Sequence, residues 1–101
     1  MRLNILLVTF ALRNPQRDYE SFFVTLRGTA FQWWHFLDQT YIVVTQFTPK
    51  ELRERLVPQM EPTDHFLIVP VDPQQADGWL PKTAWEWMVQ TGQALQKQLP
   101  E

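Results

Sequence analysis

Two arginines near the start of the chain flank a predicted helix start. Arg13 and Arg17 lie on either side of an Asn-Pro pair, Asn14 and Pro15, which is typical of an N-cap followed by the first helical residue. The free N–H groups at a helix N-terminus can hold an anion together with nearby guanidinium groups. The segment is therefore a candidate phosphate or carboxylate site. The alternative is that both arginines are solvated or paired with Asp18.

An aromatic segment supplies the second set of candidates, Trp33, Trp34 and His35. Neighbouring residues of a strand point to opposite faces, so the two tryptophans separate and His35 shares the face of Trp33. An exposed indole can stack on a nucleic-acid base or contact a protein partner, whereas the alternative is one Trp in the core and one in a dimer interface. We favour packing roles because no dense basic stripe accompanies the aromatic residues. For His35 a hydrogen-bonded structural role is favoured over a general base.

Catalytic and metal-binding motifs are not found in the sequence. There is no Gly-rich phosphate loop, nucleophile elbow or paired metal-ligand motif, and His35 and His65 lack ligand spacing. The chain has no Cys, which excludes disulfides and thiolate zinc sites. Asp18 could contribute to a metal site, but an acid near a helix N-terminus is the ordinary interpretation. We therefore expect no catalytic residue, no metal and no cofactor.

The composition sets the class of protein. With 101 residues, 45% hydrophobic and 20% charged, residues 1–101 fit a single domain. A net charge of -2 disfavours strong nonspecific binding to nucleic acid. The most apolar stretch, residues 3–12, is far shorter than the roughly 18 to 20 residues of a membrane span, and no signal-peptide cleavage pattern follows it. We expect a cytoplasmic protein without a membrane segment.

The first half of the chain predicts a strand, a helix and a hairpin. Residues 3–11 indicate a buried strand, and a helix is expected to begin at Pro15, capped by Asn14, and to end at Gly28. Residues 32–37 and 41–47 are rich in aromatic and β-branched side chains, with a polar break at residues 38–40. We therefore expect two strands joined by a tight turn.

The second half predicts a short helix, a strand and a long helix. Residues 48–51 have the form of a capping box, and the helix that follows is expected to end by Pro58. Residues 65–71 indicate a strand at the margin of the sheet, because Pro70 cannot donate to a ladder. After a turn in which Trp79 is expected to pack against the fold, Pro81 opens the last helix. Its expected apolar side is formed by Ala84, Trp85, Met88, Val89 and Leu95, with Trp87 rotated away from Trp85.

This order of elements predicts an α+β fold. The sequence β-α-β-β-α-β is that of the ferredoxin-like fold, here with a four-stranded antiparallel sheet and an extra C-terminal helix. Both faces of the first and last strands are apolar, whereas two helices cover only one face. The other face must meet the last helix or a second copy of the chain. We expect a homodimer with two-fold contacts.

Three separated segments carry a family resemblance. They are residues 13–19 (RNPQRDY) after the first strand, residues 33–38 (WWHFLD), and residues 78–82 (GWLPK) with Trp85. Together they resemble the SinR-like family of small bacterial proteins, distant relatives of the CRISPR adaptation subunit and of VapD toxins. The likeness extends from the first strand to the start of the last helix.

The resemblance implies a dimeric ferredoxin-like fold. In the CRISPR relatives it further implies metal-dependent nuclease activity or a scaffold role in holding DNA. Those relatives carry an aromatic-Asp pair at the end of the first strand, where the Asp helps bind a divalent metal. The matching positions here are Phe10 and Ala11, and alanine offers no oxygen to a hard cation such as Mg²⁺. This departure argues against nuclease chemistry.

The leading hypothesis is a non-catalytic homodimeric binding or scaffold protein that contacts other proteins. One alternative is a metal-dependent nuclease or toxin-like ribonuclease that uses Asp18 or His35. The other is nucleic-acid binding without cleavage, which would use Arg13, Arg17 and the two adjacent tryptophans.

Overall fold

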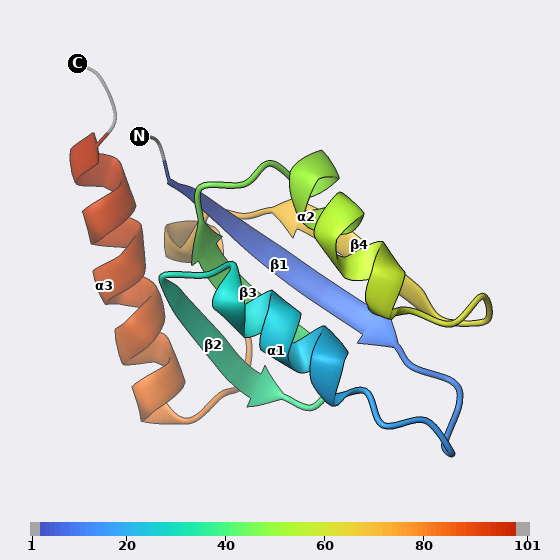
Figure 1. Cartoon of the computed structure of the whole chain (residues 1–101). Helices are drawn as coiled ribbons and strands as arrows, with labels where there is room; N and C mark the ends of the chain where they lie inside the picture. Colours follow the sequence, from blue (N-terminus) through green and yellow to red (C-terminus); the bar gives the residue numbers. More distant parts are fainter. Residues whose placement is uncertain (1–2, 99–101) are drawn as a thin grey trace.

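The computed structural model describes the backbone of residues 3–98 and the side chains of residues 3–94. The described residues form one antiparallel sheet with strand order β2-β3-β1-β4 (Figure 1). This is the predicted α+β arrangement, compatible with a ferredoxin-like fold that carries an extra C-terminal helix. The elements are β1 (Asn4–Ala11), α1 (Glu20–Gly28), β2 (Gln32–Leu37), β3 (Thr40–Thr45), α2 (Pro49–Leu56), β4 (His65–Pro70) and α3 (Lys82–Gln98), with short 3-10 helices η1 (Val57–Gln59) and η2 (Pro73–Gln75).

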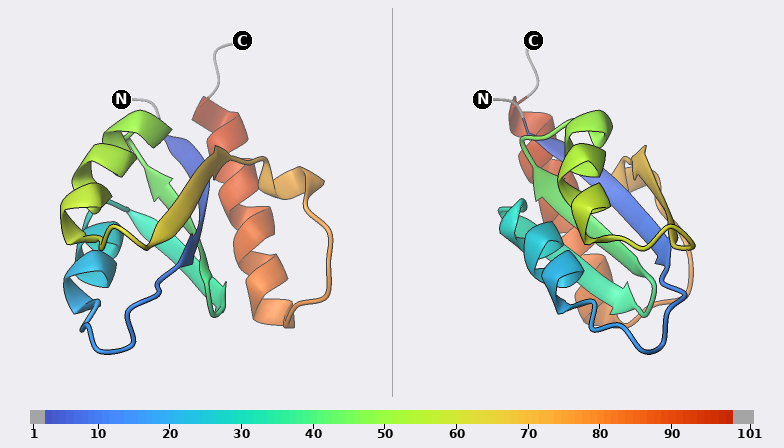
Figure 2. Two further views of the ribbon diagram at one scale, coloured as in Figure 1. Left: turned by 90° about the vertical axis from the view of Figure 1, so that its right-hand side faces the viewer. Right: turned by 45° about the vertical axis from the view of Figure 1, so that its right-hand side comes forward.

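Helices α1 and α2 cover one face of the sheet (Figure 2). Alternate residues of β1 face them because successive strand side chains point to opposite sides. The predicted capping box starts α2: Thr48 Oγ1 accepts the N–H of Glu51 at 3.2 Å, and Glu51 Oε1 accepts the N–H of Thr48 at 2.9 Å. The buried cluster on this face consists of Leu6, Val8, Phe10, Phe22, Leu26, Tyr41, Val43, Leu52 and Leu56.

Helix α3 lies on the opposite face of the same sheet (Figure 2). Ala84 and Met88 of α3 are buried against Ile5, Trp34 and Ile42 of the sheet. The chain therefore covers much of this face itself. The part of this face formed by β1, β2 and β3 is therefore buried within one molecule. On β4, which lies beyond β1, Leu67 and Val69 of the same face stay 59% and 38% exposed.

The predicted start of the first helix was wrong. Helix α1 begins at Glu20 and not at Pro15. Asn14 forms a turn instead: its Oδ1 accepts the N–H of Gln16 at 3.0 Å, and its main-chain oxygen accepts the N–H of Arg17 at 3.1 Å. The segment is not helical because its polar groups bind the loop before β4. Contacts with a segment so far away in the sequence cannot be recognised from a local pattern.

The predicted apolar side of α3 is confirmed in part. Ala84 and Met88 are buried, and Trp85 packs partly buried against the same cluster. The prediction for Val89 was wrong, because it is 53% exposed, and Trp87 is also half-buried against the sheet cluster. The expectation for Leu95 concerns a side chain outside the described residues.

The two edges of the sheet are β2 and β4. The edge position predicted for β4 from Pro70 is confirmed. Val71 N–H donates to the oxygen of Ile5 at 3.0 Å, and Pro70 is the next ladder partner, opposite Leu6. Because bonded and non-bonded pairs alternate in an antiparallel ladder, the nitrogen of Pro70 faces away from β1. None of the described helices is long and apolar enough to cross a membrane.

Two glycines give opposite predictions for stability. A Cβ at Gly92 would lie 2.7 Å from Cγ of Gln74 in η2, whereas a Cβ at Gly28 meets nothing within 4 Å. We expect Gly28→Ala to raise the free energy of unfolding by about 0.5 kcal/mol through its helix propensity. Gly92→Ala should lower the free energy of unfolding by about 1 kcal/mol. The steric overlap of its Cβ with Gln74 outweighs the gain in helix propensity. Urea denaturation of both variants measures the difference, and equal stabilisation would contradict the close approach of α3 to η2.

Candidate binding surfaces

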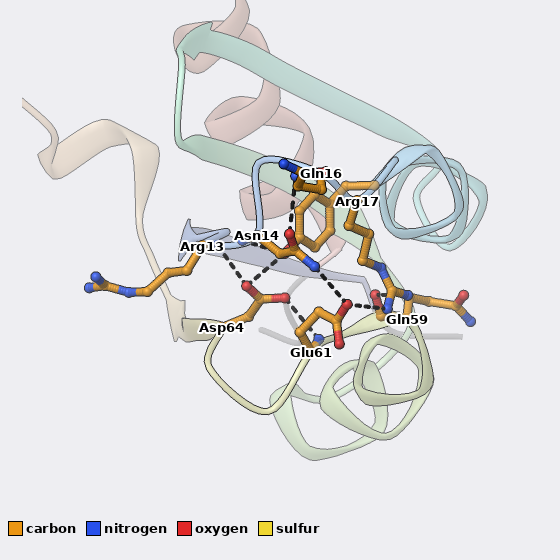
Figure 3. A network of polar contacts seen from close by, with 8 residues as sticks. Arg13, Asn14, Gln16, Arg17, Gln59, Glu61 and Asp64 are labelled. Carbon is orange, nitrogen blue, oxygen red and sulfur yellow. Dashed lines mark hydrogen bonds and ion pairs between the residues drawn. The ribbon is translucent and has the colours of Figure 1, made fainter.

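Asp64, just before β4, is the centre of a polar network (Figure 3). Its side chain is buried, with 8% of its surface exposed. Oδ1 accepts the N–H of Arg13 at 2.7 Å and the hydroxyl of Tyr19 at 2.8 Å, and Oδ2 accepts the N–H of Glu61 at 2.8 Å. The network joins the β1–α1 loop to the loop between η1 and β4.

The protonation states in this network suit a structural role. Burial by itself would raise the pKa of Asp64, but the N–H groups of Arg13 and Glu61, the Tyr19 hydroxyl and the charge of Arg17 together hold it below the ordinary value. The pKa of Tyr19 is raised, first by burial and further by the nearby carboxylates of Asp64 and Glu61, although the N–H of Asn14 opposes this. At neutral pH the carboxylate is therefore ionised and the phenol remains a donor.

Arg13 and Arg17 do not converge on a common site. Arg17 Nη1 lies 3.2 Å from Oε1 of Glu61, and its Nη2 donates to the oxygen of Gln59 at 3.0 Å. The side chain of Arg13 extends away from the network (Figure 3) and is exposed. The helix start that was expected to complete an anion site lies farther along, at Glu20. At that helix start, the main-chain N–H of Glu20 already donates to Oδ1 of Asp18 at 2.9 Å.

The aromatic candidates on β2 separate as the alternation predicts. Trp34 is 2% exposed beneath α3, whereas Trp33, which pairs with Val43, is 46% exposed on the α1 side of the sheet. His35 stacks on Tyr41, with 4.0 Å between ring centroids, and its Nε2 lies 3.2 Å from the oxygen of Asp38. The imidazole therefore helps hold the hairpin, and the buried Trp34 presents no surface for a base.

Exposed apolar residues gather along β2 and define what we call the β2 strip. It consists of Phe31, Trp33, Phe36 and Leu37, whose exposed fractions lie between 44% and 57%. The strand is an edge of the sheet, and no charged residue occurs between Arg27 and Asp38. Edge strands usually carry charges, prolines or a cover that prevent further strand pairing. β2 carries no charge and no proline, but its ladder with β3 shifts register between Trp34 and Leu37. The regular part of the strand, residues 32–34, is the part of this edge that could accept an additional strand.

The opposite edge, β4, is protected. Pro70 removes one outward N–H, as described above. Lys50 and Arg53 of α2 line a shallow groove together with Phe66 and Leu67 of β4, so two cations flank this edge. The contrast singles out β2 as the edge that is open to a partner.

The loop before α3 carries a residue that sequence reasoning placed wrongly. Trp79 was expected to pack against the fold, but its side chain is 99% exposed. Gly78 adopts φ +157, which L side chains rarely adopt, and its N–H donates to Oδ1 of its neighbour Asp77 at 2.7 Å. This backbone turn directs the indole outward. The only local signal in the sequence was a Gly-Trp pair in a polar turn. Such a pair does not specify the direction in which the tryptophan side chain points.

The described part of the chain contains no group of three or more His, Asp or Glu side chains placed to hold a metal ion. Ala11, where the resemblance expects an acid, pairs with His65 at the end of β1. A partly open apolar cavity of about 190 Å³ lies between the sheet and α3, next to Ile5 and Thr91. It is smaller than the roughly 300 Å³ at which ligand pockets begin.

Comparisons with protein families, curated proteins and solved structures find no match to this chain. The SinR-like resemblance therefore stays a prediction. The β2 strip and Trp79 both expose apolar surface in the described part of the chain.

Proposed function

We propose that the protein is a non-catalytic homodimeric binding or scaffold protein that contacts a partner protein through the β2 strip. The observation that supports this proposal most is the β2 edge, which has four exposed apolar side chains in and beside it and no charged residue within the strand. An extended segment of a partner can pair its main chain with such an edge while its side chains meet Trp33 and Phe36. A scaffold role of this kind also agrees with what the SinR-like resemblance implies.

Several observations favour a protein partner over nucleic acid. The sheet face that could stack bases is covered by α3, and Trp34 is buried there. Arg17 is already paired with Glu61, so the β1–α1 loop offers less free positive charge than its sequence suggests. The net charge of -2 adds no general attraction to phosphates.

The proposed function is tested by light scattering on size-exclusion peaks, with and without short RNA, short DNA and Mg²⁺, followed by a gel of the nucleic acid. We expect a dimer at micromolar concentration whose mass does not change and intact nucleic acid. A monomer would contradict the homodimer. Magnesium-dependent cleavage, or a mass increase with nucleic acid, would support the alternative functions instead.

The β2 strip gives a separate prediction about peptide binding. Peptides selected on the immobilised protein from a random library should bind as an added strand at β2. Phe36→Lys should weaken them about tenfold, because a charge on the strip opposes burial of an apolar contact. Val24→Lys, at a 53% exposed position on α1, should leave affinity unchanged. Fluorescence polarisation measures both, and equal affinity for the two variants would exclude the β2 strip.

A further inference from the structure

Trp79 is the most exposed large apolar residue in the described part of the chain. Its 99% exposed indole is larger than any other exposed apolar group on that loop. It follows a turn in which Gly78 has a positive φ and donates its N–H to Asp77. Large aromatic side chains that are presented to solvent in this way are typical of contact residues at protein interfaces.

A groove that suits an indole lies directly beside this loop, on the outer surface of α3. Its apolar part is formed by Leu80, Trp85 and Val89, and Val89 is 53% exposed. Lys82 and Glu86 lie at its sides with Gln90. In the described part of the molecule neither charged residue has an ion pair.

We propose that Trp79 of one copy occupies this groove on a second copy, and that the exchange is reciprocal across a two-fold axis. The inference rests on the homodimer of the proposed function and names its surface. A two-fold interface must be complementary to itself, which requires the projecting residue and its groove to lie on one patch. Trp79 and the groove meet this condition because both belong to the segment 79–90.

The charges favour a second copy over an unrelated partner. When two helices pack antiparallel about a two-fold axis that passes midway between two residues one turn apart, each of these residues lies opposite the other one on the second copy. Lys82 and Glu86 are one turn apart on α3, so each lysine can pair with the glutamate of the other copy. A dimer would thus bury both indoles within a ring of paired charges.

Sedimentation equilibrium on the full chain tests this surface with two matched tryptophan substitutions. Trp79→Ala should weaken the dimer about 100-fold, as loss of a central aromatic contact does. Trp33→Ala, which removes an exposed tryptophan from the β2 strip, should leave the affinity of the dimer unchanged. Circular dichroism confirms that both variants are folded.

Exchanging the charges of Lys82 and Glu86 is a second test of the interface. Lys82→Glu should weaken the dimer about tenfold, and the double variant Lys82→Glu with Glu86→Lys should restore it. A wild-type dimer that survives Trp79→Ala would overturn this interface and leave the proposed function intact. A dimer lost in Trp33→Ala but kept in Trp79→Ala would assign the interface to the β2 strip. A wild-type monomer would overturn both the interface and the homodimer.

Discussion

Trp34→Ala is expected to lower the free energy of unfolding by about 4 kcal/mol, the usual cost of removing a large buried aromatic side chain. Trp34 is 2% exposed and packs in the cluster between the sheet and α3, with Phe36 at 5.3 Å between ring centroids. The cavity left behind lies under Ala84 and Met88, so amide exchange in α3 should accelerate with the loss of stability. Urea denaturation and hydrogen exchange measure the two effects.

Two variants serve as controls for Trp34→Ala. Trp33→Ala, at the 46% exposed neighbour, should cost no more than about 1 kcal/mol. Trp34→Phe should also be mild, because Nε1 of Trp34 is buried without a hydrogen-bond partner and its removal relieves an unsatisfied donor. If the two alanine variants lost equal stability, the assignment of Trp34 to the interior would be contradicted.

Asp64→Asn is expected to lower the free energy of unfolding by about 3 kcal/mol at neutral pH. The three donors around Asp64 all face acceptor oxygens, and an amide nitrogen in place of either oxygen would face a donor. Whichever oxygen is replaced, one main-chain N–H, that of Arg13 or that of Glu61, would be left without its acceptor. Urea denaturation at neutral pH measures the change.

Acid should have the same effect as the substitution. The pKa of Asp64 is lower in the folded protein than its ordinary value of 3.8. Its contribution to stability is therefore fully present above that ordinary value and is lost as the pH falls through the lower, folded-state pKa. Wild type should lose stability over this window, and Asp64→Asn should lose less. Asp38→Asn, at an exposed site in the hairpin turn, should retain the wild-type pH dependence. An unchanged acid response in Asp64→Asn would show that other groups govern it.

The strands and the edge position of β4 follow from local pattern. Alternating or continuous apolar residues mark β1, β3 and β4, and Pro70 alone predicts that β4 is an edge. The capping box at Thr48 and Glu51 is equally local, because its donors and acceptors lie within one turn. These features need no information from distant parts of the chain, and the structure confirms them.

The candidate sites depended on distant contacts and were less predictable. Arg17 was a candidate anion ligand by sequence, but its partners Glu61 and Gln59 lie more than 40 positions away. Trp79 was expected to pack because large aromatic residues usually do, yet the turn at Gly78 directs it outward. Neither the pairing of two loops nor the direction of a turn is encoded in residue spacing.

The network around Asp64 has a consequence for the kinetics of unfolding. The bond from Arg13 to Asp64 joins residues 51 positions apart, and closing so long a loop is entropically costly before the intervening strands are in place. We therefore expect these contacts to form after the transition state, so that their loss would mainly accelerate unfolding. On that expectation, the buried carboxylate affects how long the native state persists more than how quickly it is reached.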